Sequence, residues 1–503
     1  MELLQNLAVG FQTALTLTNL FYCLAGVFLG TAIGVLPGLG PVATISMLLP
    51  ITFGLPPETA LIMLAGIFYG AQYGGSTTAI LVNLPGESSS VVTALDGYQM
   101  ARKGKAGLAL STAAIGSFIA GTIATVLIAC FAPPLADLAV KFSAAEYFSL
   151  IVLGLVASIV LAHGSLLHAI GMIFVGLALG LVGGDVNSGV FRYTFDYPEL
   201  TDGIGFVVVA MGLFGLAEVI GNLAQKTERS IMAERVSGLI PSKKEFKEML
   251  PPILRGTALG SFLGLLPGGG ATLSSFAAYS LEKKVSRRPQ DFGKGALAGV
   301  AGPESANNAG AQTSFIPMLT LGIPGNPVMA LMIGALIVHG IQPGASMITE
   351  QPKLFWGVVA SMWIGNATLL VLNLPMIGMW VRLASMPYNY LYPAILVFCA
   401  IGVFSLSNST FDIHLMAIFG VIGYLLRKIE CEPAPLLLGF ILGPMLEEYL
   451  RRAMLISGGD PSVLVTRPIS ALMLVLAVVL LFTVLSPHLR KKREEVFQDE
   501  GTA

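Results

Sequence analysis

Four Pro-Gly interruptions within apolar stretches are the feature of this sequence with the clearest chemical meaning. They lie at residues 37–40, 85–86, 267–270 and 324–325. Proline removes a backbone donor and clashes with the preceding helical turn, and glycine opens conformations that are closed to other residues. Amides freed in this way cannot face lipid, because each unsatisfied group costs several kcal/mol there. The broken segments must therefore be buried in protein or line a polar cavity.

Such breaks suit the binding of an anion together with a hard cation. A helix that begins after a break directs free N–H groups and the positive end of its dipole toward the break. Unwound carbonyls and hydroxyl or amide oxygens suit Na⁺, and few Lys or Arg residues lie nearby. The predicted substrate ligands are Asn83, Pro85, Gly86, Ser88, Ser89, Gly322, Pro324, Gly325 and Asn326. The predicted Na⁺ ligands are Gly38, Gly40, Ser76, Thr77, Gly268, Gly270, Asn307 and Asn308.

Each of these residues also has a purely structural interpretation. Gly, Ser and Thr allow helices to pack closely in a bilayer, and any one of them alone serves that role equally well. The four breaks taken together favour binding. Glu87 and Glu304 stand beside the motifs and could bind cations or protons, or hydrogen-bond buried helix ends. Asp96 and Glu58 are interpreted as loop or cap residues.

The composition shows what must position these segments. The chain has 503 residues, of which 54% are hydrophobic and 11% charged, and its mean hydropathy is +0.79. Soluble proteins carry about 25% charged residues. Apolar runs close to the roughly 20 residues that cross a bilayer include 106–130, 147–161, 204–220, 354–372, 394–404 and 471–485. We predict an all-α polytopic membrane protein of about 11–14 helical segments, several of them broken.

An internal repeat organises the chain. Residues 30–40 reappear as residues 260–270 with six of eleven positions identical, including the ending Leu-Pro-Gly-x-Gly. The segment that begins Asn83-Leu-Pro-Gly is echoed by Gly322-Ile-Pro-Gly. The two motifs occur in the same order in both halves, which indicates two related repeats.

The basic residues predict that the repeats are inverted. The loop 52–58 has no Lys or Arg, whereas its counterpart 283–294 is strongly basic; conversely, residues 102–105 are basic and residues 341–346 are not. Short basic loops stay on the cytoplasmic side, so equivalent loops lie on opposite sides of the membrane. Inverted repeats with broken helices are typical of secondary transporters.

The predicted organisation has four parts. They are a first membrane repeat at 1–225, a basic cytoplasmic linker at 226–250, a second, inverted repeat at 251–458, and an extra transmembrane helix with a cytoplasmic tail at 459–503. The extra helix, near 469–485, brings the basic tail to the cytoplasmic side. It leaves Arg451, Arg452 and Arg467 facing outward, against the charge rule.

Other function classes lack support in the sequence. The net charge is −1 and no basic cluster is interleaved with aromatics, so nucleic acid is not an expected partner. No GxxxxGK[ST] string occurs, and the glycines of 38–43 follow a membrane segment rather than a strand, which excludes a dinucleotide site. The four cysteines and five histidines form no metal or catalytic set, and no cofactor is expected beyond a coupling cation. The first ten residues lack the basic start of a signal peptide, so the mature chain is expected to begin near Met1.

The motifs also resemble those of a known family. They are PGLGP at 37–41, YGGSTTAIL at 73–81, NLPG at 83–86, TALDGY at 93–98, FGKG at 292–295, PESANN at 303–308 and LGIPG at 321–325. This set closely resembles the large membrane subunit of tripartite tricarboxylate transporters over nearly the whole chain.

The resemblance implies a secondary transporter of the bacterial inner membrane, driven by Na⁺ or H⁺. It implies two partners, a small membrane subunit of about four helices and a periplasmic binding protein, and a di- or tricarboxylate such as citrate as substrate. The alternatives are an organic-anion channel and a polytopic membrane enzyme. A channel needs a continuous polar stripe, and an enzyme needs a nucleophile with a partnered base; neither pattern is visible, so the chain is not expected to be an enzyme.

Overall fold

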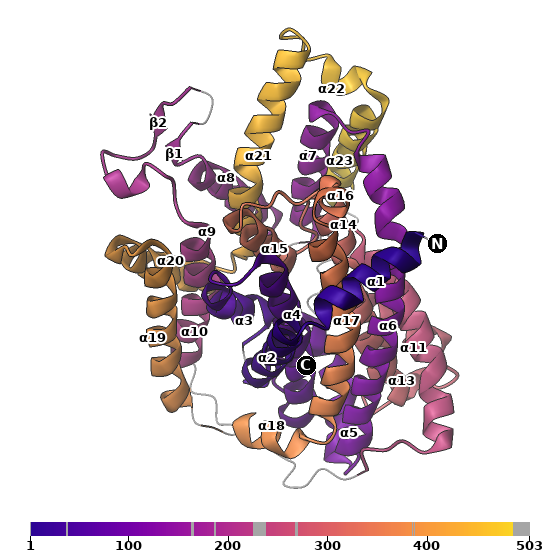
Figure 1. Cartoon of the computed structure of the whole chain (residues 1–503). Coiled ribbons are helices and arrows are strands. Elements are labelled where there is room, and N and C mark those ends of the chain that lie inside the picture. The colour runs from indigo at the N-terminus through magenta and orange to yellow at the C-terminus, as the bar shows by residue number, and fades with distance from the viewer. Residues whose placement is uncertain are drawn as a thin grey trace. The chain divides into compact units, whose positions relative to one another are not determined.

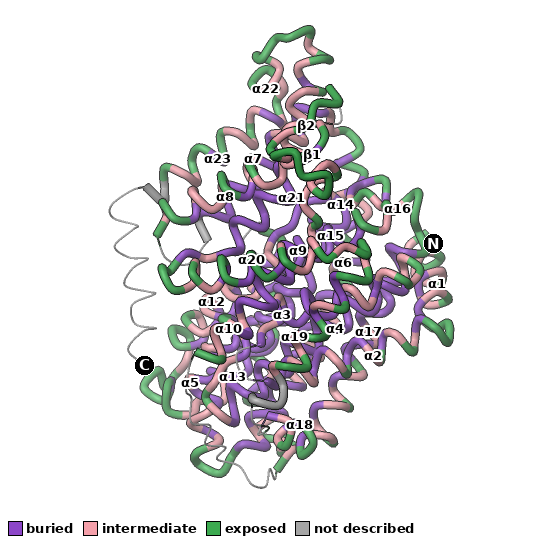
Figure 2. Tube along the Cα trace, turned by 90° about the vertical axis from the view of Figure 1, so that its left-hand side faces the viewer, coloured by how far each residue is buried: buried purple, intermediate pink, exposed green. Residues whose placement is uncertain are grey.

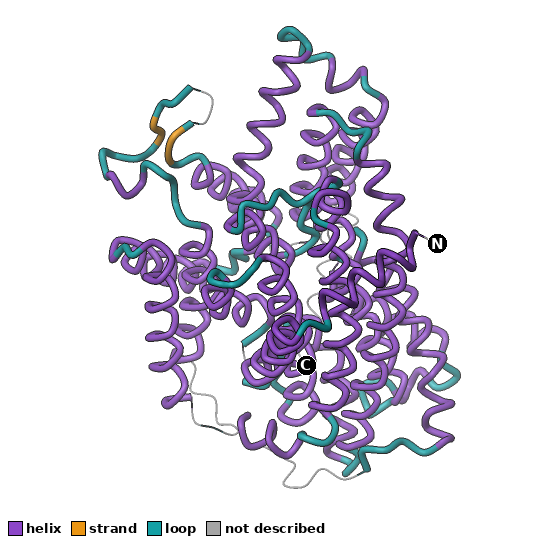
Figure 3. The backbone as a smooth tube through the Cα atoms, in the orientation of Figure 1, coloured by secondary structure: helices purple, strands orange, loops and turns teal. Residues whose placement is uncertain are grey.

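The computed structural model describes residues 2–36, 39–161, 165–185, 188–224, 238–266, 270–384, 386 and 388–485. Helices dominate this part of the chain, and its strands β1 (Gly183–Gly184) and β2 (Phe191–Arg192) form one short antiparallel pair (Figures 1 and 3). The predicted all-α class is confirmed.

The chain forms two compact units, each assembled from two stretches of sequence. The first comprises residues 1–140 and 205–425, and the second comprises 141–204 and 426–503. Helices of the first unit are α1 (Glu2–Ala14), α2 (Leu17–Gly34), α3 (Pro41–Leu48), α4 (Pro57–Val82), α5 (Val91–Arg102), α6 (Ala106–Ala139), α9 (Phe206–Ala210), α10 (Ala217–Ala224), α11 (Lys243–Gly264), α12 (Gly270–Val285), α13 (Leu297–Thr313), α14 (Phe315–Leu321), α15 (Pro327–Val338), α16 (Ser346–Glu350), α17 (Pro352–Asn373), α18 (Ile377–Ala384), α19 (Tyr388–Ser407) and most of α20 (Thr410–Lys428). Those of the second are α7 (Ala144–Leu161), α8 (Leu166–Gly180), α21 (Ala434–Ile456), α22 (Val463–Thr466) and α23 (Pro468–Leu485).

Many of these helices are suited to a bilayer. Among the described residues, five helices are long and apolar enough to cross a membrane, and six shorter apolar helices accompany them. All six apolar runs singled out in the sequence lie in helices, and the predicted extra C-terminal helix is α23. The chain is therefore a polytopic membrane protein.

Glycine contacts hold equivalent helix pairs together in the two repeats. Three glycines spaced four residues apart line one face of α2, and three more line one face of α11. A Cβ at any of them would collide with the backbone of the neighbouring helix, so the backbones touch directly. The facing pairs are Gly26–Met63, Gly30–Ile67 and Gly34–Ala71 between α2 and α4, and Gly256–Gly302, Gly260–Ala306 and Gly264–Gly310 between α11 and α13.

These contacts also fix helix directions. The facing positions advance together along both members of each pair, so α2 runs parallel to α4, and α11 runs parallel to α13. The chain returns between them through α3 in one repeat and α12 in the other. The repeated sequence motif therefore marks a repeated helix–break–helix unit.

Equivalent helices of the two repeats run in opposite directions. Contacts between α4 and α13 advance from Gln72 to Ser76 on one helix and retreat from Asn307 to Glu304 on the other. The same reversal relates α6 and α17, in which Asn366 bonds the Phe118 carbonyl and Trp363 bonds the Thr122 carbonyl. These directions agree with inverted repeats. The repeat boundaries and the side of the membrane on which each loop lies stay predictions.

Helix α13 is polar yet enclosed. All residues from Gly299 to Thr313 are buried, and among them are Glu304, Asn307, Asn308 and Gln312. Helix α4 is likewise buried from Thr59 to Leu81 (Figure 2). Polar side chains on such helices cannot face lipid without a large cost, so they must bond one another.

The three arginines that conflicted with the charge rule have acidic partners within the second unit. Arg467 pairs with Glu146 at 2.5 Å, and Arg452 pairs with Glu448 at 2.6 Å. Arg451 binds Asp185 at 3.1 Å and Glu447 at 2.6 Å. These ion pairs neutralise the three charges locally, and the side of the membrane on which the arginines lie stays a prediction.

A capping box starts α11 inside the predicted linker, of which residues 226–237 lie outside the described part. The Ser242 amide donates to the Glu245 carboxylate at 2.7 Å, and the Glu245 amide donates to the Ser242 hydroxyl at 3.3 Å. Hydrogen bonds from the Ser242 side chain and backbone lower the pKa of Glu245. The cap thus stabilises α11 at pH values above the ordinary glutamate pKa and is lost as the pH falls through the lowered value.

The glycine contacts predict a sharp difference between two alanine substitutions. Gly260→Ala places a methyl group against the Ala306 backbone and should destabilise the fold by about 1–3 kcal/mol. Gly221→Ala, in helix α10, is the matched control because nothing lies within 4 Å of its Cβ position. Thermal unfolding in detergent should show a lower Tm for the first variant and an unchanged or higher Tm for the second. Equal Tm values would contradict the close approach.

Candidate functional site

The second break of each repeat has the same backbone course. Helix α4 ends at Asn83 and α14 ends at Gly322, and both residues adopt the left-handed conformation, with φ values of 57° and 71°. Four residues later the chain is extended at Glu87 and Asn326, with φ values of −147° and −158°. Each of these two residues is the N-cap of the following helical segment. In each repeat, a Pro-Gly pair therefore lies between the C-cap of one helix and the N-cap of the next helical segment, and the backbone follows the same course in both repeats.

The first break of each repeat lies against the second. Pro37, Gly38 and residues 267–269 are outside the described part of the chain, so two predicted Na⁺ ligands, Gly38 and Gly268, have no described position. The neighbouring Gly40 lies beside Gly86, whose carbonyl oxygen would be 2.8 Å from an added Cβ. In the other repeat, Gly270 lies beside the Asn326 side chain, because a Cβ added to Gly270 would be 3.5 Å from the Cβ of Asn326.

Side chains then join one repeat to the other. The Ser88 hydroxyl lies 2.9 Å from that of Thr272, in the first turn of α12. The Asn307 amide donates to the Glu87 carboxylate at 3.3 Å and accepts from Gln72 at 3.2 Å. The described parts of the four breaks therefore gather around α4, α12 and α13.

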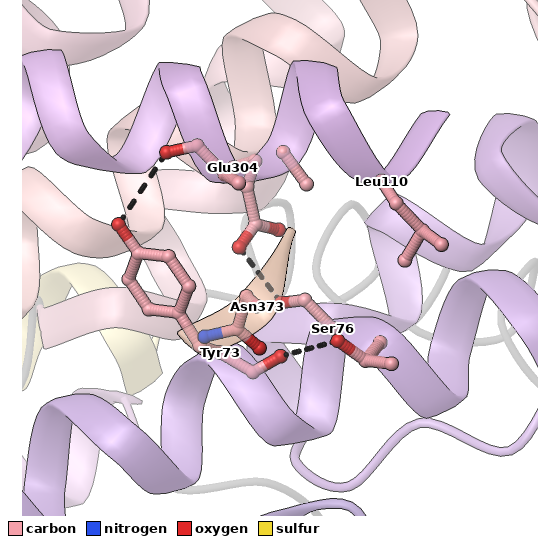
Figure 4. A pocket seen from close by; sticks show the side chains of 8 residues that line it. Tyr73, Ser76, Leu110, Glu304 and Asn373 are labelled. Atoms are coloured by element: carbon pink, nitrogen blue, oxygen red, sulfur yellow. Dashed lines mark hydrogen bonds between the residues drawn. The ribbon is translucent and has the colours of Figure 1, made fainter. Parts of the chain in front are cut away.

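A second polar cluster surrounds Glu304, one helical turn from Asn307 and Asn308. Its carboxylate accepts hydrogen bonds from Ser76 at 2.7 Å, Thr93 at 2.8 Å and Ser117 at 3.3 Å. Asn308 in turn donates to the Ser117 hydroxyl at 2.6 Å. Figure 4 shows Glu304 and Ser76 on the wall of a small cavity that Tyr73 and Asn373 also line.

Comparison with known proteins identifies the family. The model of the Tripartite tricarboxylate transporter TctA family matches residues 20–438. The chain belongs to this family.

Two relatives in Agrobacterium vitis are similar to this TctA-family chain over their full lengths. An uncharacterized 52.8 kDa protein in the TAR-I ttuC′ 3′ region is 60% identical over 500 residues, covering 99% of this chain and 100% of the relative. An uncharacterized protein in the TAR-II ttuC′ 3′ region is 58% identical over 241 residues, covering 48% of this chain and 100% of the relative. No solved structure matches the chain. Because the family is tripartite, membership implies a small membrane subunit and a periplasmic binding protein as partners.

Asp96 shows how a motif of this TctA-family chain acts across the repeats. Its carboxylate accepts the amides of Gly295 and Ala296, each at 2.7 Å, and the Tyr279 hydroxyl at 3.0 Å. Since Ala296 is the N-cap of α13, Asp96 caps that helix from α5. The interpretation of Asp96 as a loop or cap residue was wrong about its position, because Asp96 lies buried inside α5, and its carboxylate instead bonds the start of a helix in the other repeat.

The predicted site residues with a described position do not all meet in one place. Gly86, Ser88, Asn307 and Gly40 meet in the contacts between breaks, and Gly270 and Asn326 meet beside them. Ser76 and Asn308 belong to the Glu304 cluster, while Thr77 bonds its own helix through the Tyr73 carbonyl at 3.1 Å. Asn83 and Gly322 end helices, and the remaining predicted residues are Pro85, which is partly buried, and Ser89, Pro324 and Gly325, which are buried.

Sequence reasoning missed several residues that the structure adds. Gln72 is a polar residue in the segment before the second break, and Thr93 lies in the TALDGY motif. Their positions in the sequence did not predict that Gln72 bonds Asn307 or that Thr93 bonds Glu304. Ser117, Thr272 and Asn373 carried no local signal, because the partners of Ser117 and Thr272 come from distant parts of the chain and Asn373 reaches the Glu304 cavity only through the packing of α17.

The Asp96 cap generates a stability prediction. Asp96→Ala removes three hydrogen bonds to a buried carboxylate and should cost about 2 kcal/mol or more, and Asp96→Asn should cost less because an amide oxygen still accepts. Asp137→Ala, at an exposed position of α6, is the control and should stay within about 0.5 kcal/mol of the parent. Thermal unfolding in detergent measures all three; an Asp96→Ala variant as stable as the Asp137→Ala variant would contradict the cap.

Proposed function

We propose that the chain is the large transmembrane subunit of a binding-protein-dependent secondary transporter. It imports a tricarboxylate, dicarboxylate or related organic anion by symport with Na⁺ or H⁺. The substrate is held at mid-membrane by the paired Pro-Gly breaks. Family membership supports the transporter class, and the contacts between the breaks support the location.

One observation carries the proposal: breaks from two inverted repeats meet in one place. Ser88 of the first repeat contacts Thr272 of the second, and Gly40 and Gly270 lie against the second break of their own repeats. Helices α3 and α15 both begin at a break. No side chain caps α3 at Gly40, and Pro41 has no N–H, so the amides of Val42 and Ala43 are the ones available to a carboxylate. The break segments contain no Lys or Arg, which leaves backbone dipoles and a co-bound cation to meet the negative charge.

The proposed assembly follows the tripartite plan. A small membrane subunit of about four helices accompanies this chain in the bacterial inner membrane, and a periplasmic binding protein delivers the substrate. The central linker and the C-terminus lie in the cytoplasm. The binding protein largely sets which carboxylate is carried, so the residues of this chain define a carboxylate site rather than one named anion.

Reconstitution of the three subunits in proteoliposomes tests the function directly. Labelled citrate should accumulate saturably, and an inward Na⁺ gradient should increase the initial rate because the cation enters with the anion. Uptake that never saturates would favour an anion channel instead. Conversion of the substrate without uptake would favour a membrane enzyme.

Substitution at the break provides a matched pair of variants. Ser88→Ala removes the contact with Thr272 and should lower carboxylate uptake several-fold while leaving the amount of folded protein unchanged. Ser405→Ala removes an exposed hydroxyl that bonds only its own helix, at the Ile401 carbonyl, and should transport normally. Full uptake by the Ser88→Ala variant would remove this serine from the proposed site.

A further inference from the structure

Glu304 is a buried carboxylate whose hydrogen-bond partners are all neutral. The residue is 1% exposed, and three hydroxyls donate to its oxygens. Asn308 donates to the Ser117 hydroxyl, so the hydrogen of that hydroxyl is directed toward Glu304. Within the described chain, no Lys, Arg or His forms an ion pair with it. An ionised carboxylate placed in this way needs a positive partner, because an uncompensated buried charge is strongly destabilising.

A small cavity adjoins this carboxylate. Its volume is about 10 Å³, close to the minimum that holds one water molecule. Its wall combines Glu304 of α13 with Tyr73, Ser76 and Thr77 of α4 and with Asn373 at the end of α17 (Figure 4). Both repeats contribute to it, since α4 belongs to the first repeat and α13 and α17 belong to the second.

Asn373 supplies an independent sign that something binds there. Its side chain is 4% exposed, its amide nitrogen donates to the Leu369 carbonyl at 2.9 Å, and its amide oxygen Oδ1 is buried without a hydrogen-bond partner. A buried acceptor without a donor is destabilising. The Asn373 oxygen is therefore available to an occupant of the cavity.

Three occupants are of the right size, and they differ in what they satisfy. A water molecule would donate to Asn373 Oδ1 but leave the Glu304 charge uncompensated. A proton on Glu304 would remove the charge but leave the Asn373 oxygen without a partner. A Na⁺ ion alone would do both, because a hard cation takes carboxylate, amide and hydroxyl oxygens as ligands. A protonated Glu304 with a water molecule beside it would also satisfy both groups, and the response of the protein to sodium distinguishes these two states.

We propose that this cavity is a Na⁺ site in which Glu304 supplies the negative charge and Asn373 and Ser76 supply neutral oxygen ligands. The role of the site in coupling rests on the proposed transport function, but binding of the ion does not. Sodium then joins helices of both repeats at Glu304, one helical turn from Asn307, whose amide contacts Glu87 beside the Pro85-Gly86 break.

Thermal unfolding of the purified full-length chain in detergent tests the site without substrate or partner proteins. Sodium chloride is titrated against choline chloride at constant ionic strength, with potassium chloride as a second control. Sodium should raise Tm specifically, and above the dissociation constant each tenfold increase in concentration should add a constant increment. A parent protein whose Tm is the same in all three salts overturns the proposal.

Three variants assign the effect to these residues. Glu304→Gln should abolish the sodium-dependent rise in Tm. Asn373→Leu should also abolish it, yet leave Tm in choline unchanged or higher, because the oxygen it removes has no partner in the protein. Ser361→Ala is the control on the same helix, where the hydroxyl bonds only the Val358 carbonyl at 2.7 Å, and it should keep the full rise.

The results separate the site from the transport proposal. A sodium-dependent rise that persists in either Glu304→Gln or Asn373→Leu overturns the site, and the Asn373→Leu result alone decides if Glu304→Gln does not fold. Loss of the rise in both variants, with retention in Ser361→Ala, supports it. The same supporting result, combined with no uptake of any di- or tricarboxylate by the reconstituted assembly, contradicts the proposed transport function and leaves the Na⁺ site standing.

Discussion

The requirement that no backbone amide or carbonyl be left bare in lipid governs the structure. A Pro-Gly pair releases several such groups in the middle of an apolar segment, where each costs several kcal/mol if it meets hydrocarbon. The chain meets this requirement by placing the breaks against one another and against the enclosed helices α4 and α13. Glycine contacts make the enclosure possible, because they bring α2 onto α4 and α11 onto α13 with backbone touching backbone. The described parts of the breaks thereby have protein neighbours, and the proposed carboxylate site is built from them.

The same requirement applies to charge. Asp96 places its carboxylate on the N-terminus of α13, where three donors and the helix dipole stabilise it. Arg451, Arg452 and Arg467 each meet a carboxylate. Glu304 differs, because its hydrogen bonds come from side-chain hydroxyls in the interior of the fold, and its partners among the described residues include neither the amides of a helix N-terminus nor an arginine. That contrast, rather than the acidity of the residue alone, is what distinguishes Glu304 from the structural carboxylates around it.

The fold could be predicted from the sequence as far as local rules reach. Pro-Gly pairs predicted the breaks, the repeated Leu-Pro-Gly-x-Gly ending predicted equivalent units, and the distribution of Lys and Arg predicted the inversion with which the directions of α4 and α13 agree. Contacts between distant helices were beyond these rules. Asn373 ends an otherwise ordinary apolar helix, and only the packing of α17 against α4 and α6 gives its amide oxygen a meaning. Glu304 was recognised as a polar residue near a motif, but its three hydroxyl partners come from three different helices, which no spacing in the sequence records.

Cysteine cross-linking at the junction between repeats tests the central claim most directly. Ser88 and Thr272 lie with their hydroxyl oxygens 2.9 Å apart, so cysteines at these positions can form a disulfide without large backbone movement. The four native cysteines, one of which is exposed, would first be replaced, and oxidation would be followed in native membranes, where a protease cut in the central linker separates unlinked halves. The account predicts that the halves of the Ser88→Cys/Thr272→Cys variant stay joined until a reductant is added, whereas those of either single variant separate. Separation of the oxidised double variant would show that the breaks of the two repeats do not meet, and would contradict the account.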